Sequence, residues 1–141
     1  MSFCLTGCLS KTITFAQSVR IPSEHLASEF DKYKNPYENA GKVVIVRDSG
    51  LIEDNKIEIY VNGKKIATFH DGGQSLVFYL PEGDYVLGAK SILPLATDQT
   101  LERALTTEKG KEYFYKLSAA AETGALMKEM ELYFERSYLV K

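Results

Sequence analysis

The fold of this chain is decided by one stretch, Lys56-Ile57-Glu58-Ile59-Tyr60-Val61-Asn62-Gly63-Lys64-Lys65-Ile66-Ala67-Thr68-Phe69. Apolar residues alternate with polar ones ahead of the Asn-Gly pair, which is the pattern of a half-buried strand. Asn62-Gly63 suits a type I′ turn, because both central residues of that turn need a positive φ and its twist matches that of the flanking strands. The stretch therefore predicts a β-hairpin.

A two-residue loop at Asn62-Gly63 fixes which residues of the hairpin face each other. Ile59 is expected opposite Ile66, and Ile57 opposite Thr68. One face of the hairpin then points to the core. The other, mixed face carries Glu58, Tyr60, Lys65 and Ala67.

Further β-rich runs follow on both sides of the hairpin, separated by turn residues about every 8–15 positions. These runs are 42–47, 74–80, 85–90, 100–107 and 112–117. Positions 43–46 are all apolar, which suggests a strand covered on both faces. Short strands at this spacing favour a mainly β fold, an antiparallel β-sandwich, over alternating βαβ units. We expect strands over 118–141 as well, with a terminal helix left open.

The chain before the first confident strand is expected to form an arm. Residues 9–40 are interpreted as this N-terminal arm and 41–141 as the sandwich domain. Pro22-Ser23-Glu24 resembles a helix start, and Leu26, Phe30 and Tyr33 follow at i, i+4 and i+7 on one face. The arm is therefore predicted to contain a short docking helix.

Composition narrows the class of protein. The chain has 141 residues, the size of one compact domain, and its 17 basic and 19 acidic residues nearly balance. Such a balance gives no net field to attract nucleic acid, so a nucleic-acid partner is not expected. Both cysteines, Cys4 and Cys8, lie in the first eight residues, so we expect no disulfide, thiolate metal site or cysteine nucleophile in the domain.

The first eight residues contain a signal of their own. Leu5-Thr6-Gly7-Cys8 has the form of a lipobox, in which small residues precede the cleavage point and the thiol of Cys8 takes a diacylglycerol. A secretory signal also needs a basic region and an apolar region of about 7–15 residues. Residues 1–8 are therefore interpreted as the remnant of a signal that starts further upstream. The alternative is that Cys8 is an ordinary residue of a frayed end.

The order of these features resembles small bacterial envelope lipoproteins that carry a PEGA-like, carboxypeptidase-regulatory-like β-sandwich. The likeness rests on the lipobox, the entry strand at 41–47, the hairpin at 57–66, the corner Leu80-Pro81-Glu82-Gly83-Asp84-Tyr85 and the late strand at 109–115. It covers roughly residues 41 to 117. The resemblance implies binding or assembly rather than catalysis.

The residues available for catalysis are few. A base beside a carboxylate occurs at His70-Asp71, with Ser75 nearby, and His25 is the other histidine. Neighbours on a strand point to opposite faces, so a polar hairpin loop is the better interpretation and no catalytic residue is assigned. The acidic loop residues match no calcium-binding loop and the glycines match no phosphate loop, so no metal or cofactor is expected.

Aromatic residues are the unusual component, with nine tyrosines and seven phenylalanines. Outward rings can anchor a protein partner or stack on a sugar, because interface hot spots favour tyrosine. The candidates are Tyr60, Tyr79 and either the pair Tyr113 and Tyr115 or Phe114. Filling the core is the alternative use of each ring.

These observations predict a non-enzymatic, lipid-anchored binding or assembly module of the cell envelope. Cys8 is its membrane tether, residues 9–40 its spacer and docking arm, and an envelope protein its expected partner. Leu9 stands where an aspartate would favour the inner membrane, so the outer membrane is predicted, with the domain facing the periplasm. A soluble binding or inhibitor domain without an anchor is the alternative. A small hydrolase using His25 or His70 is a third hypothesis.

Overall fold

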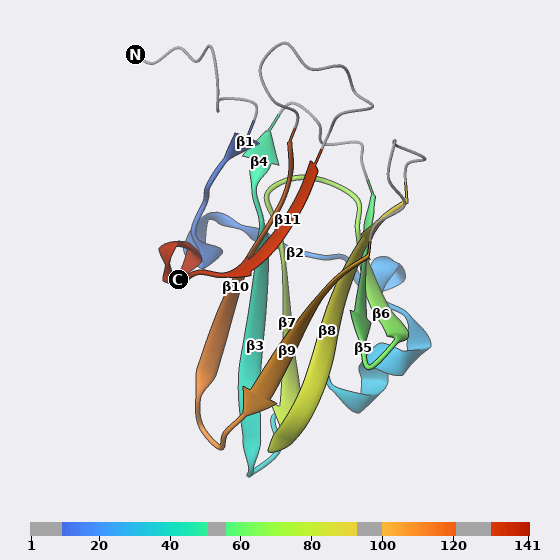
Figure 1. Ribbon diagram of the computed structural model, residues 1–141, viewed down its shortest axis with the longest axis vertical. Coiled ribbons are helices and arrows are strands. Elements are labelled where there is room, and N and C mark those ends of the chain that lie inside the picture. The colour runs from blue at the N-terminus through green and yellow to red at the C-terminus, as the bar shows by residue number, and fades with distance from the viewer. Residues whose placement is uncertain (1–9, 51–55, 93–99, 121–130) are drawn as a thin grey trace.

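Two β-sheets packed face to face make up the body of the protein, and the short strands β1 (Ser10–Lys11) and β4 (Ser49–Gly50) form a separate two-stranded sheet (Figure 1). The structure is a computed structural model and describes residues 10–50, 56–92, 100–120 and 131–141. In spatial order the larger sheet contains β11 (Glu131–Arg136), β10 (Glu112–Ala120), β3 (Ala40–Arg47), β7 (Gln74–Pro81) and β2 (Val19–Arg20). The smaller contains β6 (Lys64–Phe69), β5 (Ile57–Val61), β8 (Gly83–Ser91) and β9 (Thr100–Thr107). The predicted mainly β sandwich is confirmed.

The hairpin is present as β5 and β6, and its turn has the expected backbone. Asn62 and Gly63 have φ values of 50° and 80°. The register differs from the prediction, because a β-bulge lies beside Ile59 and shifts the pairing by one residue. Ile59 therefore pairs with Ala67 rather than Ile66, and Ile57 with Phe69 rather than Thr68. The extra residue brings Ile66 and Ala67 both into the core, which alternation alone does not allow.

Strand β3 is the centre of the larger sheet and is buried on both faces, as its apolar run predicts. Val43, Val44, Ile45 and Val46 have no exposed surface. β3 pairs antiparallel with β7 on one side and parallel with β10 on the other. The β2–β7 pairing is also parallel, so the sheet is mixed rather than purely antiparallel.

The main core lies between the two sheets. It is built from the inward residues of both sheets, together with Ile21 and Phe30 from the arm. Large side chains fill it, among them Phe69, Phe78, Tyr115 and Phe134. Each contributes about 1.5–3 kcal/mol by leaving water, which is the main force holding the sheets together.

A second apolar cluster covers part of the outer face of the larger sheet. Val44, Val46 and Phe114 point outward and pack against Ile13 from the N-terminal segment and Val140 from the C-terminal segment. Val140 belongs to the 3-10 helix η5 (Tyr138–Val140), which lies beside β10 in Figure 1. The two terminal segments thus cover one part of this face and leave the rest open.

The arm docks on the sandwich, but it contains no α-helix among the described residues. Its helical turns are the 3-10 segments η1 (Phe15–Gln17), η2 (Ser23–His25) and η3 (Ser28–Lys32). The predicted docking helix is wrong because Leu26 is extended and forms a β-bridge with Ala67, while the Ala27 N–H donates to the Ile66 carbonyl at 2.9 Å. Phe30 nonetheless enters the core. Through the bridge and this hydrogen bond, the arm covers part of the free edge of β6.

The arm is paired from its first described residue, in the small two-stranded sheet. β1 pairs antiparallel with β4, so the arm contacts the rest of the protein from Ser10 onward. At the other end of the chain, β11 confirms the expected strand, whereas the last turn is 3-10. In the described part of the chain, no helix has the length and apolar character needed to cross a bilayer.

Candidate functional site

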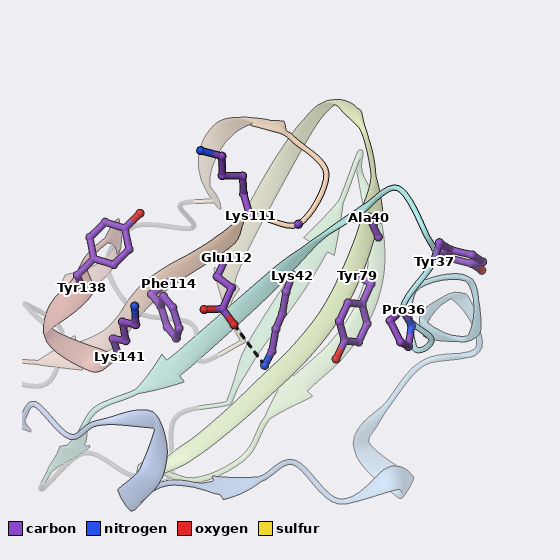
Figure 2. Close-up of a pocket in the computed structure, with 11 residues that line it drawn as sticks. Pro36, Tyr37, Ala40, Lys42, Tyr79, Lys111, Glu112, Phe114, Tyr138 and Lys141 are labelled. Atoms are coloured by element: carbon purple, nitrogen blue, oxygen red, sulfur yellow. Dashed lines mark ion pairs between the residues drawn. The ribbon is translucent and has the colours of Figure 1, made fainter.

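A groove of about 510 Å³ opens on the uncovered part of the outer face of the larger sheet (Figure 2). Its walls come from the segment before β3, the ends of three strands, the β9–β10 turn and η5. The lining residues are Pro36, Tyr37, Ala40, Lys42, Tyr79, Gly110, Lys111, Glu112, Phe114, Tyr138 and Lys141. Ligand clefts commonly have volumes of about 300–1,000 Å³, so the groove has the size of a ligand site.

Strand register explains why these side chains meet. Lys42 of β3 pairs with Tyr79 of β7 on one side and with Glu112 of β10 on the other, which sets three polar side chains in one row across the sheet. The next outward residue of β10 is Phe114, because side chains alternate between the faces of a strand. The groove floor is therefore a polar row beside an aromatic ring.

Lysines give the groove its charge. Figure 2 shows the ion pair between Lys42 and Glu112, whose Nζ and Oε2 atoms are 3.7 Å apart. Lys111 and Lys141 form no ion pair with any carboxylate of the described residues, and both are exposed. Three cations thus share one carboxylate within a chain whose net charge is −2. The groove is a locally positive site on a slightly acidic protein.

Aromatic rings stand on both sides of the lysines. Tyr37 is 46% exposed and Tyr138 is 60% exposed, and Figure 2 shows them on opposite sides of Lys42 with Tyr79 and Phe114 between them. The hydroxyl of Tyr138 accepts a hydrogen bond from Arg136 at 3.0 Å, which orients the ring. Such rings offer flat apolar faces with a polar tip.

The four tyrosines predicted as partner-binding residues are not gathered in one place. Tyr79 lines the groove, whereas Tyr60 lies on the other sheet and donates its hydroxyl to Glu58 at 2.8 Å. Burial, reinforced by that hydrogen bond, raises the pKa of Tyr60 to about 12. Tyr113 and Tyr115 are buried in the main core, so their rings are not offered to a partner. Phe114, the alternative, is the ring of that strand that faces the groove.

The histidines lie together but away from a nucleophile. The rings of His25 and His70 stack on each other, and the Ser75 hydroxyl instead accepts a hydrogen bond from Ser18 at 2.7 Å. Gln74 accepts the backbone N–H groups of His70 and Asp71, which is the polar hairpin loop that the sequence favours. No hydrolytic arrangement is assembled at these residues.

Asp48 is the most unusual carboxylate among the described residues. Its side chain is 2% exposed, and neither carboxylate oxygen has a hydrogen-bond partner. Burial raises its pKa to about 6 against the opposing charge of Lys116, which is 3.5 Å away. Among the described residues, no three histidine, cysteine or acidic side chains lie close enough to hold a metal ion. The proposed lipidation residue Cys8 and its neighbours Leu5, Thr6 and Gly7 lie outside the described residues.

Comparison with protein-family models and with curated proteins found no match to this chain. What the groove can bind is therefore inferred from its lining residues alone. Sequence reasoning missed most of its residues, among them Lys42, Lys111, Glu112, Tyr138 and Lys141. The one available signal was the charged Lys42 directly ahead of the apolar run 43–46.

Proposed function

We propose that this protein is a non-enzymatic binding module of the bacterial cell envelope, and that the groove on the larger sheet is its ligand-contact surface. The observation that carries the proposal is the meeting of three lysines and four aromatic rings in one open groove. Such groups bind by charge and by stacking, and their exposure at Tyr37 and Tyr138 gives a partner direct access.

The proposal includes a lipid tether on Cys8, supported by the Leu5-Thr6-Gly7-Cys8 motif and by the likeness to envelope lipoproteins. Only two peptide units separate Cys8 from Ser10, which already pairs in β1. Two residues span at most about 7 Å, so an anchored domain would lie close to the bilayer with the β1–β4 end toward it.

This orientation leaves the groove accessible. Figure 1 shows β1 and β4 at one end of the molecule and the first residues of β3 and β10 at the other. The groove begins at those first residues and extends to η5. In an outer-membrane lipoprotein facing the periplasm, ligands would therefore reach the groove from the side away from the membrane.

The anchor is tested by the intact mass of the protein purified from its native host's membranes, using the native upstream DNA. We expect the mass of residues 8–141 plus acyl chains. We also expect Cys8→Ser to lose the label when cells grow in labelled palmitate. An unmodified chain that still contains residues 1–7 would reject the anchor and leave the soluble binding or inhibitor domain as the function.

The contact surface is tested separately by site-specific photo-cross-linking in living cells. A photoreactive residue is placed at Tyr138, on the groove, and in a matched variant at Val86, which is 39% exposed on the other sheet. We expect adducts at position 138 and none at position 86. Adducts at position 86 alone, or at neither position, would show that the groove is not the contact surface.

A further inference from the structure

The floor of the groove offers side chains but no free backbone. β3 has a paired neighbour on each side, so its N–H and C=O groups at Lys42 are used in the β-ladders. An extended peptide that binds by adding a strand needs an open sheet edge. This groove excludes that mode, and recognition there must rely on charge and ring faces.

The ion pair between Lys42 and Glu112 indicates that the groove can bind a negatively charged group. Lys42 faces the Glu112 carboxylate at 3.7 Å, a distance longer than a direct hydrogen bond. Nζ of Lys141 lies 5.9 Å from the Phe114 ring, at the outer limit of a cation–π contact. A ligand carboxylate can therefore contact Lys42 in place of Glu112 and reach Lys111 and Lys141 without breaking a strong contact.

The rings define the rest of the ligand. Tyr37 and Tyr138 lie on either side of the lysines, so a ligand that spans the groove reaches aromatic rings as well as cations (Figure 2). The C–H faces of a pyranose ring are apolar and stack on such rings, while its hydroxyl groups stay in water. Acid groups on an apolar ring match this mixture of lysines and tyrosines.

We propose that the groove binds an acidic glycan, with sugar carboxylates at Lys42, Lys111 and Lys141 and sugar rings on Tyr37 and Tyr138. This inference rests on the proposed function, because it names the ligand class of the same groove. Uronic-acid oligomers are the representative ligands. Phosphate-bearing sugars share the negative charge but not the carboxylate geometry that Glu112 supplies in the free protein.

Isothermal titration of the purified protein with a short oligogalacturonate tests the proposal. We expect binding that weakens as salt rises, because exposed charges are screened. Lys111→Gln combined with Lys141→Gln should weaken it by about tenfold or more, the loss of roughly two charge-assisted contacts. The matched control is Lys56→Gln combined with Lys64→Gln, which removes the same charge from exposed residues at the smaller sheet and should leave affinity within about twofold.

Three comparison ligands separate the alternatives. A neutral oligosaccharide of the same length should not bind detectably, and glucose phosphate should bind more weakly than the uronate. Oligoglutamate should also bind more weakly. Tighter binding of oligoglutamate would identify an acidic peptide site, and equal binding of the neutral sugar or no effect of the lysine changes would overturn the proposal. Cross-linking at Tyr138 does not depend on which ligand is titrated. Adducts at Tyr138 without uronate binding would therefore reject the acidic-glycan proposal while still supporting the groove as the contact surface.

Discussion

The imidazole rings of His25 and His70 lie nearly parallel, with their centroids 3.6 Å apart and an interplanar angle of 8°. His25 ends η2 in the arm, and His70 follows β6. The stacked rings therefore join the arm to the end of β6, the strand whose edge the arm covers. Nδ1 of His25 is buried without a hydrogen-bond partner, so this atom adds no polar bond to the packing of the two rings.

Acidification should loosen this contact. Burial lowers the pKa of His70, and the charges of His25, Lys56 and Arg47 lower it further, against the opposing effect of Asp71. The unfolded chain then binds protons more readily than the folded one. Stability is full above the unfolded pKa of about 6.5 and falls as the pH drops through it toward the folded pKa.

The measurement is urea unfolding of the wild type and of His70→Phe between pH 5 and 8. The wild type should lose stability on acidification, and the variant should lose less, because phenylalanine keeps a ring but takes no proton. The variant Asp71→Asn is the control. Removing that carboxylate lowers the pKa of His70 further, so stability should fall more steeply on acidification than in the wild type. Equal pH dependence in all three proteins would show that the stack carries no pH sensitivity.

Asp48→Asn should stabilise the protein at alkaline pH. The pKa of Asp48 is raised to about 6 from 3.8, so the folded protein binds the proton more tightly and stability decreases as the pH rises through this range. The ionised form costs roughly 3 kcal/mol above pH 7. We expect most of that to be recovered in the asparagine variant at pH 8 and none at pH 3.5, in denaturant titrations at the two values.

The partner of Asp48 supplies a control for that experiment. Lys116 is 31% exposed and can turn to water when Asp48 is neutral. Lys116→Gln should instead destabilise the protein at pH 8, because it leaves the buried carboxylate unpaired. If Lys116→Gln raised stability at pH 8, the assignment of Asp48 as an ionised buried group would be wrong.

Gly41→Ala should destabilise the sandwich by about 1–3 kcal/mol, the usual effect of overpacking. A Cβ at this position would lie 3.0 Å from the Tyr113 ring, 3.2 Å from the Glu108 carbonyl oxygen and 3.3 Å from the Thr107 Cβ. The backbone oxygen cannot move aside easily. Thermal melting of the variant should show the loss.

Gly88→Ala is the matched comparison for this change. Gly88 also lies within a strand, but a Cβ there would be 3.4 Å or more from its neighbours, close to ordinary contact. The variant should be neutral or more stable by up to about 1 kcal/mol, because alanine restricts the unfolded chain. Equal losses at both positions would point to β-strand glycines in general rather than to crowding at Gly41.

Phe30→Ala should release the arm from the smaller sheet. Phe30 is 8% exposed and packs in the main core, so its truncation should cost about 3 kcal/mol. The Ala27 N–H, which donates to the Ile66 carbonyl, should then exchange with deuterium faster than in the wild type. Tyr37→Ala, at a ring that is 46% exposed, should leave this exchange unchanged. Protection of Ala27 that persists in Phe30→Ala would mean that β6 alone holds the arm.

The local features of this fold could be predicted from sequence, and the long-range ones could not. Asn62-Gly63 specifies its turn by backbone preference alone, and the apolar run at 43–46 implies a strand covered on both faces. The bulge beside Ile59 escaped prediction, because it depends on Ile66 and Ala67 both being drawn into the core. The arm does not form the predicted helix, because its backbone hydrogen-bonds to the edge of β6 instead of within a helix.

The groove illustrates the same limit more strongly. Its central row needs the parallel pairing of Lys42 with Glu112 and the antiparallel pairing of Lys42 with Tyr79. No local pattern encodes either partner. The alternation of side chains along a strand predicts that Phe114 lies on the opposite face of β10 from Tyr113 and Tyr115. It does not predict which face is covered, because that depends on where the two terminal segments dock.

The parallel neighbour of β3 also sets an order of events during synthesis. Lys42 and its partner Glu112 are roughly 70 residues apart, so the centre of the larger sheet stays open along one edge until most of the chain has left the ribosome. β3 is the most apolar strand of that sheet, and an open apolar edge invites pairing with other chains. A nascent chain of this protein therefore stays incompletely folded until its last third emerges. That delay makes chains truncated before β10 prone to aggregate.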